Sequence, residues 1–236
     1  MADFVKDLSL LPSDPGATVD AMQIAIALYD HLTALDAIGP YQVLANVPGA
    51  EVVFVADRTG PIPDDTALQL TAAATFDEVQ APEIVVVPGG TITRRMARDG
   101  HPVIDWVKAV HPTTRWTTSV CTGSILLAAA GVLEGREATS HWAALPQLEA
   151  FGARPTLQRV VVGDGVVTAA GVSSGIDMAL HLVAELQGPE VAQAIQLAIE
   201  YDPQPPFDAG SPTKAPAGVV DLVRAISGER EAATLA

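Results

Sequence analysis

Cys121 is the only cysteine in the 236 residues of this chain, and it lies in the segment Ser119-Val120-Cys121-Thr122-Gly123. Small residues two positions before and after it are typical of a sharp turn from a strand to a helix, because bulky neighbours would collide there. A thiol in such a turn lies near free N–H groups at the start of the helix, and these favour a thiolate. A lone cysteine is more often an inert packing residue, but this pattern predicts a nucleophile elbow that carries a catalytic thiol.

Two other short segments could take part in the same chemistry. Asp36 falls in the first turn of a predicted helix, where an acidic residue could also serve only as a cap or as a partner of the helix dipole. Gly89 and Gly90 follow directly after an apolar run, where two glycines either form an ordinary turn or expose backbone N–H groups. Neither feature indicates a site by itself.

The elements that must position these residues alternate along the chain. Buried strands are predicted at residues 22–29, 50–56, 83–87 and 115–120, each followed by a helical or mixed segment. This order predicts an α/β fold, a flavodoxin-like sandwich of a mostly parallel sheet with helices on both faces. Ligands bind at the carboxyl edge of such sheets. The fold would therefore bring Asp36, Gly89-Gly90 and Cys121 to one edge.

Less regular segments give weaker predictions. We expect a loop at residues 58–65, a short edge strand at 68–71 and a hairpin at 157–169 around Gly163-Asp164-Gly165. Pro40 should end or kink the first helix, and Thr33 could cap it. We divide the chain into an N-terminal extension at 1–20, an α/β domain at 21–201 and a C-terminal part at 202–236. The last part is a proline-rich arm followed by a short helix at 217–226.

Composition and charge narrow the class of protein. Half of the residues are hydrophobic (49%), and the formal net charge is −15, which argues against binding nucleic acid or an anionic membrane surface. No apolar run approaches the ~18 residues of a membrane span. The first 20 residues lack the basic start and the apolar core of a signal peptide, so with one reactive thiol we expect a cytoplasmic protein.

The core from about residue 22 to 215 resembles the DJ-1/PfpI superfamily and, within it, the isonitrile hydratases. The Cys121 segment matches the superfamily, whereas the acid-bearing helix and the proline-rich arm match that branch. The matching segments are Leu35-Asp36 with Gly39-Pro40, Val87-Pro88-Gly89-Gly90, Thr118-Ser119-Val120-Cys121-Thr122-Gly123-Ser124, His141-Trp142-Ala143, Gly175-Ile176-Asp177, Glu200-Tyr201 and Pro205-Pro206-Phe207.

The resemblance implies a cysteine-dependent hydro-lyase that converts a small-molecule isonitrile and water to an N-substituted formamide through a thioimidate. Cys121 would be the nucleophile and Thr122 its supporting neighbour. Asp36 would be the acid/base, at a position where many superfamily members carry Glu. We expect no metal and no other cofactor, because the sequence holds no clustered ligand set. An ordinary Asp is a poor acid, so the pKa of Asp36 must be raised by burial or the residue must share a proton with Cys121.

Other residues complete the predicted site. Gly89 and Gly90 would supply backbone donors to an oxyanion, and the segment that contains Val172 would pack beside the cysteine. His141 and Trp142 could line an apolar pocket or belong to the shell of the core. The proline-rich arm is expected to lie across a partner subunit in a homodimer, or else to fold back on its own domain.

Three alternatives remain at this point. His141, 20 residues after Cys121, could serve a peptidase, glyoxalase, deglycase or amidase of the same superfamily. The thiol could instead be a redox sensor that oxidises to the sulfinic acid. Regulators of transcription with a similar domain form the third alternative, but they carry a basic helix-turn-helix region. Here only Lys214, Arg224 and Arg230 are basic after residue 200, so the sequence argues strongly against a regulator.

Overall fold

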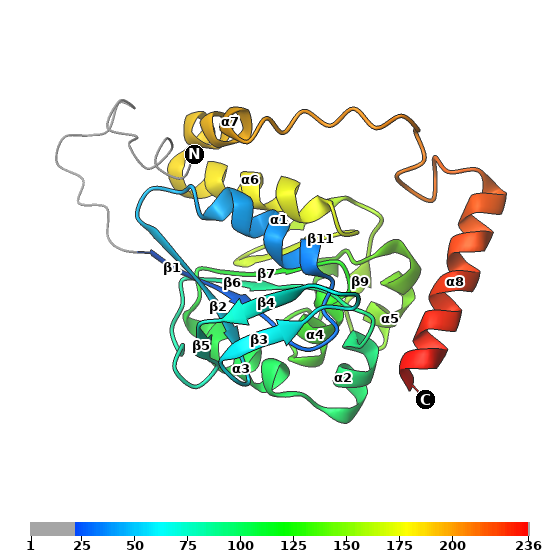
Figure 1. Ribbon diagram of the computed structural model, residues 1–236, viewed down its shortest axis with the longest axis horizontal. Helices are drawn as coiled ribbons and strands as arrows, with labels where there is room; N and C mark the ends of the chain where they lie inside the picture. The colour runs from blue at the N-terminus through cyan, green and yellow to red at the C-terminus, as the bar shows by residue number, and fades with distance from the viewer. Residues whose placement is uncertain (1–21, 236) are drawn as a thin grey trace.

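The computed structural model describes residues 22–235 (Figure 1). The predicted N-terminal extension at 1–20 lies outside the described residues. A seven-stranded sheet forms the centre, in the order β10-β11-β7-β6-β1-β2-β5. Neighbouring strands are parallel except β10 and β11, which form the expected hairpin. The strands are β1 (Met22–Ala27), β2 (Ala50–Ala56), β5 (Ala74–Thr75), β6 (Ile84–Val87), β7 (Trp116–Val120), β10 (Val160–Val162) and β11 (Val166–Ala169).

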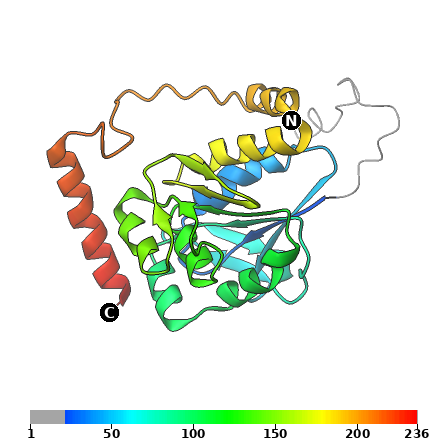
Figure 2. The same ribbon diagram turned by 180° about the vertical axis from the view of Figure 1, so that it is seen from behind.

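Helices cover both faces of this sheet, as the two opposite views show (Figures 1 and 2). One layer contains α1 (Ala34–Leu44), α6 (Ser174–Gln187) and α7 (Pro189–Ala198). The other contains α2 (Thr93–Asp99), α3 (Pro102–Val110), α4 (Gly123–Ala129) and α5 (Leu145–Glu149). The predicted fold class, a mostly parallel sheet in an α/β sandwich, is confirmed.

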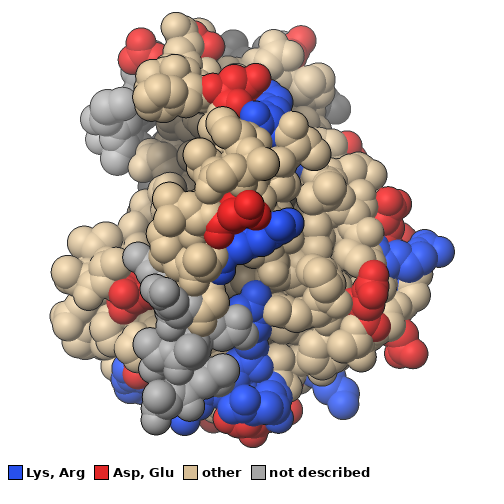
Figure 3. Space-filling model, turned by 90° about the vertical axis from the view of Figure 1, so that its right-hand side faces the viewer, with Lys and Arg blue, Asp and Glu red and all other residues tan. Residues whose placement is uncertain are grey.

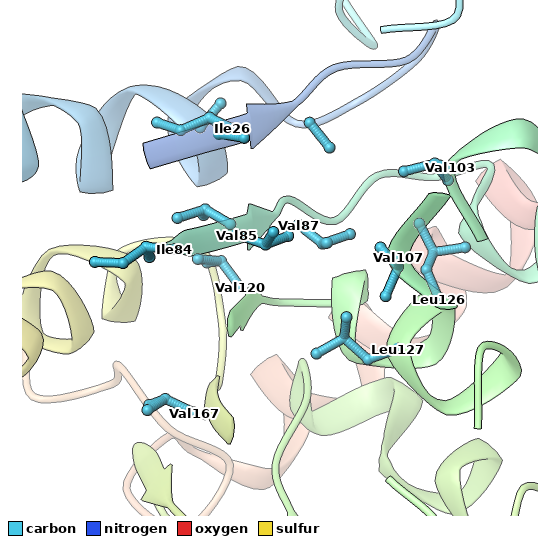
Figure 4. Packing of buried hydrophobic residues seen from close by; sticks show 14 of the residues in the cluster. Ile26, Ile84, Val85, Val87, Val103, Val107, Val120, Leu126, Leu127 and Val167 are labelled. Carbon is cyan, nitrogen blue, oxygen red and sulfur yellow. The ribbon is translucent and has the colours of Figure 1, made fainter. Parts of the chain in front are cut away.

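The central strands are apolar because both of their faces are covered. All four residues of β6 are fully buried, and they pack with Val103 and Val107 of α3 and with Leu126 and Leu127 of α4 (Figure 4). Burying one such side chain contributes about 1.5–3 kcal/mol. This packing holds the carboxyl ends of β6 and β7 side by side, and the candidate site lies there.

Two local predictions for the first half of the chain are wrong. Residues 58–65 are not only a loop, because β3 (Gly60–Pro63) pairs antiparallel with β4 (Gln69–Ala72) in a separate two-stranded sheet. The predicted short edge strand at 68–71 is confirmed as β4, which pairs with β3 and not with the main sheet. Pro61 and Pro63 are tolerated because a strand with an unpaired side can carry residues that lack an N–H.

Pro40 does not end the first helix, which continues to Leu44. The ring contacts α6, since a Cβ added to Gly175 would lie 3.1 Å from Pro40 Cγ. Its missing N–H leaves the Asp36 carbonyl without a helical donor. Thr33 occupies the N-cap position but makes no capping hydrogen bond, and its hydroxyl instead donates to Asp65 at 3.4 Å.

The C-terminal part crosses back over the domain. After α7 the proline-rich arm runs along the molecule to α8 (Ala217–Leu235), which stands at one side (Figures 1 and 2). The predicted short helix at 217–226 is thus 19 residues long. The face on the α8 side is largely uncharged, with acidic and basic side chains set beside each other (Figure 3). Among residues 22–235, no helix combines the length and apolarity needed to span a bilayer.

The segment between α4 and β10 adds small elements that the sequence did not predict. Strands β8 (Glu137–Ala138) and β9 (Arg154–Pro155) form a second two-stranded sheet, which is parallel. A 3₁₀ turn at Trp142–Ala144 follows β8 and leads into α5. This segment carries His141 to the candidate site.

Candidate active site

Cys121 lies on the turn between β7 and α4 with a φ of +57°, a value that residues other than glycine seldom adopt. Four hydrogen bonds hold this conformation. The Cys121 N–H donates to the carbonyls of Ala169 (3.1 Å) and Ala170 (2.7 Å), and the Cys121 carbonyl accepts from the hydroxyls of Ser124 (3.1 Å) and Ser140 (3.0 Å). Such backbone strain costs about 1–3 kcal/mol and is kept mainly at functional positions. The predicted nucleophile elbow is confirmed.

The glycine after the elbow is needed for contact with the neighbouring strand. A Cβ added to Gly123 would lie 2.1 Å from the Val87 carbonyl oxygen and 2.7 Å from that of Pro88. Any side chain there would push the elbow away from the end of β6. The small-residue pattern thus reflects a contact between two segments as well as the sharpness of the turn.

Asp36 lies in the first turn of α1 and is fully buried. Its Oδ2 accepts a hydrogen bond from the Gly89 N–H at 2.9 Å, and its Oδ1 has no hydrogen-bond partner. Burial raises the pKa of Asp36 to about 7, although the Gly89 N–H and the Cys121 thiol both lower it. The expectation that burial raises this pKa is confirmed. A carboxyl group with such a pKa can both accept and donate a proton near neutral pH.

The Cys121 thiol does not have the lowered pKa that its place before a helix suggested. Cys121 is only 7% exposed. This burial raises the pKa of the thiol well above its ordinary value, and the charge of Asp36 adds to the increase. The backbone N–H and the hydroxyl of Thr122 oppose this shift without cancelling it. The cost of desolvating the thiolate is therefore larger than the stabilisation that the N-terminus of the seven-residue helix α4 gives it. The resting thiol keeps its proton.

The N–H groups of Gly89 and Gly90 are committed to protein partners. Gly89 donates to Asp36, and Gly90 donates to the Thr122 Oγ1 at 3.0 Å. The Thr122 hydroxyl in turn donates to the Gly90 carbonyl at 3.1 Å. Both donors hold Asp36 and Thr122 in place, and a role of these N–H groups toward an oxyanion stays a prediction.

Tyr29 belongs to this arrangement, although the sequence analysis assigned it no role. Its side chain is buried, and its hydroxyl donates to the carbonyl of Pro88, the residue before Gly89. Burial and the charges of Asp36 and Cys121 raise its pKa. Its place at the end of an apolar run could have indicated this role, because a buried phenol requires a hydrogen-bond partner.

A cavity of about 190 Å³ lies over Cys121. His141 and Val172 line it, as predicted, whereas Trp142 lines two neighbouring cavities instead. Arg94 and Ser227 also line it, and the sequence analysis assigned no role to either. The full lining is Thr33, Asp65, Gly90, Thr91, Thr93, Arg94, Cys121, Thr122, His141, Ala143, Ala144, Val172 and Ser227.

His141 is arranged as a hydrogen-bond donor rather than as a base. Its Nδ1 accepts from the Ala143 N–H at 3.3 Å. Burial, and then the charge of Arg94, lower its pKa, so the ring is neutral near pH 7 with its proton on Nε2. A base that activates the thiol would need a free lone pair on that nitrogen. This geometry disfavours a Cys–His pair of the kind that the alternative activities require.

The fold and the site agree with the comparisons to known proteins. The model of the DJ-1/PfpI family matches residues 22–185, and the chain belongs to that family. It is 42% identical over 204 residues to the isonitrile hydratase of Pseudomonas putida, an alignment that covers 86% of this chain and 89% of that protein. The predicted resemblance is thereby confirmed.

Two further relatives are less similar in sequence than the hydratase. A ThiJ/PfpI family protein from Pseudomonas syringae has a crystal structure that superposes with a TM-score of 0.85 at 36% identity, over 94% of this chain and 97% of that one. The glutathione-independent glyoxalase DJR-1.2 of Caenorhabditis elegans is 28% identical over 66% of this chain and 80% of its own length. The similarity to the hydratase is thus both higher and more extensive than the similarity to the glyoxalase.

Proposed function

We propose that the chain catalyses the hydration of isonitriles, R–N≡C + H₂O → R–NH–CHO. The observation that carries this proposal is the buried Asp36 carboxyl beside the Cys121 thiol, with one carboxyl oxygen unpartnered and a pKa of about 7. The 42% identity to isonitrile hydratase supports it. The terminal carbon of an isonitrile must gain both a nucleophile and a proton, and this pair of side chains can supply both.

In the first half of the reaction, Asp36 moves a proton from sulfur to carbon. The carboxylate accepts the proton of Cys121, and the thiolate sulfur bonds to the terminal carbon. The Asp36 carboxylic acid then protonates the same carbon, which gives the thioimidate R–N=CH–S–Cys and restores the carboxylate. The high pKa of the resting thiol is no obstacle, because the proton moves to a neighbouring base during the attack.

In the second half, water attacks the thioimidate carbon while Asp36 accepts one of its protons. Asp36 then gives that proton to the nitrogen, which forms the tetrahedral adduct R–NH–CH(OH)–S–Cys and restores the carboxylate. The C–S bond then breaks, the hydroxyl oxygen becomes the formyl oxygen, and its proton returns to the thiolate through Asp36. The sum is one isonitrile and one water consumed and one formamide formed, with no electron transferred.

Thr122 and His141 would assist these steps. The Thr122 backbone N–H interacts with the sulfur and lowers the pKa of the thiol, so it stabilises the departing thiolate. The His141 Nε2–H can donate to the substrate nitrogen as that atom becomes basic, since the ring lines the cavity over Cys121. Val172 forms an apolar wall of the same cavity.

Turnover of a simple isonitrile tests the proposal. The purified protein should consume cyclohexyl isonitrile, with loss of the N≡C stretch in the infrared and growth of the formyl proton signal in NMR. Cys121→Ala should reduce turnover to the uncatalysed rate. Equal turnover by Cys121→Ala would exclude covalent catalysis, and inactivity of the wild type on several isonitriles with activity on methylglyoxal would favour the glyoxalase alternative.

We also propose that the protein acts as a cytoplasmic homodimer, built from the α/β domain at 21–201 and the arm at 202–236. Large apolar side chains of α7, the arm and α8 support this, since Leu197, Phe207 and Leu222 are 79%, 77% and 59% exposed. A reduced thiol suits the cytoplasm. Sedimentation at 24.5 kDa, the mass of one chain, rather than at twice that mass would contradict the dimer.

A further inference from the structure

A second cavity of about 350 Å³ adjoins the cavity over Cys121, and His141 and Val172 line both. We propose that this second cavity, called here the substituent cavity, binds the apolar alkyl or aryl group of the isonitrile. The assignment rests on the proposed function. The cavity is lined by Leu35, Thr139, Ser140, His141, Trp142, Leu157, Arg159, Ala170, Gly171, Val172, Ser173, Gly210, Ser211 and Pro212.

One end of the substituent cavity is lined by direct neighbours of the reacting residues. Leu35 directly precedes Asp36 on α1. The Ala170 carbonyl accepts the Cys121 N–H at 2.7 Å, and the Ser140 hydroxyl donates to the Cys121 carbonyl. A substrate whose terminal carbon meets the sulfur can therefore extend past His141 and Val172 into this space.

The walls of the cavity favour an apolar group. Leu35 and Leu157 are 45% and 61% exposed, so the core does not account for them, and large apolar side chains around a hollow are typical of binding sites. The positive charge of Arg159, which lines the same cavity, is neutralised within the protein. Arg159 pairs with Asp177 through its Nε, and its second amino group donates to Ser173 at 3.3 Å. A charged substituent would have to compete with these contacts.

The proline-rich arm closes one side of the cavity through Gly210, Ser211 and Pro212. The Arg224 guanidinium of α8 lies 5.5 Å from the centre of the Trp142 ring, on the wall shared with the arm. Such a cation–π contact is attractive and links α8 to the wall of the cavity. The arm therefore limits the size of the group that fits in this cavity.

Substrate size separates this inference from the proposed function. We compare kcat/KM for cyclohexyl and methyl isonitrile in the wild type, in Leu157→Ala and in Leu68→Ala. The ratio of cyclohexyl to methyl kcat/KM should fall about tenfold in Leu157→Ala, since methylene contacts in a pocket discriminate by this order. Leu68 is an exposed leucine outside both cavities, so Leu68→Ala should leave the ratio unchanged.

A filling variant tests the arm. Gly210→Trp adds a large ring at a position where an added Cβ meets nothing within 4 Å. It should lower the same ratio about tenfold or more. An unchanged ratio in both cavity variants, with normal turnover of both substrates by the wild type, would overturn the substituent cavity alone. No turnover of either substrate by the wild type would overturn the proposed function and this assignment with it.

Discussion

Asp36→Asn is expected to abolish turnover and to stabilise the fold more at pH 8 than at pH 5.5. An unfolded aspartate has a pKa near 3.8, and burial raises that of Asp36 to about 7 in the folded protein. Between these values the unfolded chain releases the proton first, so rising pH favours unfolding. Above about 7 both states are ionised and the effect is constant. At about 1.36 kcal/mol for each pH unit, the whole interval is worth about 4 kcal/mol.

The part of this effect between pH 5.5 and 8 is about 2 kcal/mol. Asparagine has no proton to lose, so the free energy of unfolding of Asp36→Asn relative to the wild type should rise by that amount. The new amide NH₂ group sits at the buried oxygen position without a partner and costs about 1–3 kcal/mol. That cost does not depend on pH and cancels in the difference. We choose pH 5.5 as the lower limit because the isoelectric point is about 4.5.

Urea unfolding followed by tryptophan fluorescence measures the difference, with Asp64→Asn as the matched control. Burial alone would raise the pKa of Asp64, but hydrogen bonds from Thr66 and Leu68 together lower it. Its stabilising effect is lost only in acid, so Asp64→Asn should show no trend between pH 5.5 and 8. A relative stability of Asp36→Asn that is equal at both pH values would refute the raised pKa and the acid/base role that depends on it.

Three further predictions concern Asp36 and the residues that contact it. In the wild type, kcat/KM should rise with pH and level off above about 7 as the Asp36 carboxylate forms, which a pH–rate profile tests. Tyr29→Phe removes the hydrogen bond to the Pro88 carbonyl and so loosens the neighbouring Gly89 N–H, which lowers the pKa of Asp36. The rising part of the pH–rate profile should therefore move to higher pH. A fall in rate without that shift would indicate only a structural role for Tyr29. In Gly89→Ala, the Cβ would lie 2.6 Å from the Thr122 nitrogen and 2.8 Å from Asp36 Oδ2, so kcat/KM should fall about 100-fold or more, and near wild-type activity would contradict the close packing of the site.

Much of the fold could be predicted because the strands are covered on both faces. The apolar runs at β1 and β6 and the β-branched run at β7 favour buried strands, and their order fixes a parallel sheet whose edge collects Asp36 and Cys121. The exceptions are elements that depend on distant partners. Strand β3 contains two prolines and is a strand only because β4 pairs with it. The apolar-to-polar change after residue 226 suggested the end of the last helix, yet α8 continues to Leu235.

The identities of the site residues were easier to predict than their electrostatics. The elbow pattern identified Cys121, but the pKa of the thiol depends on how deeply the carboxyl edge is buried, which no local pattern records. The same limit applies to Gly89 and Gly90. A strand followed by two glycines shows that N–H groups are exposed by the turn, and only the fold shows that Asp36 and Thr122 take them.

The protonated thiol bears on the choice between catalyst and redox sensor. Oxidation to the sulfinic acid begins from an exposed thiolate, and here burial leaves Cys121 only 7% exposed and keeps its thiol protonated. A hydratase is compatible with the same condition, because its nucleophile has to be a thiolate only while Asp36 holds the proton. The resting pair of a thiol and a carboxylate already contains the sulfur and the hydrogen that the isonitrile carbon must receive. The burial that makes Cys121 a poor sensor therefore preserves the proton that this addition needs.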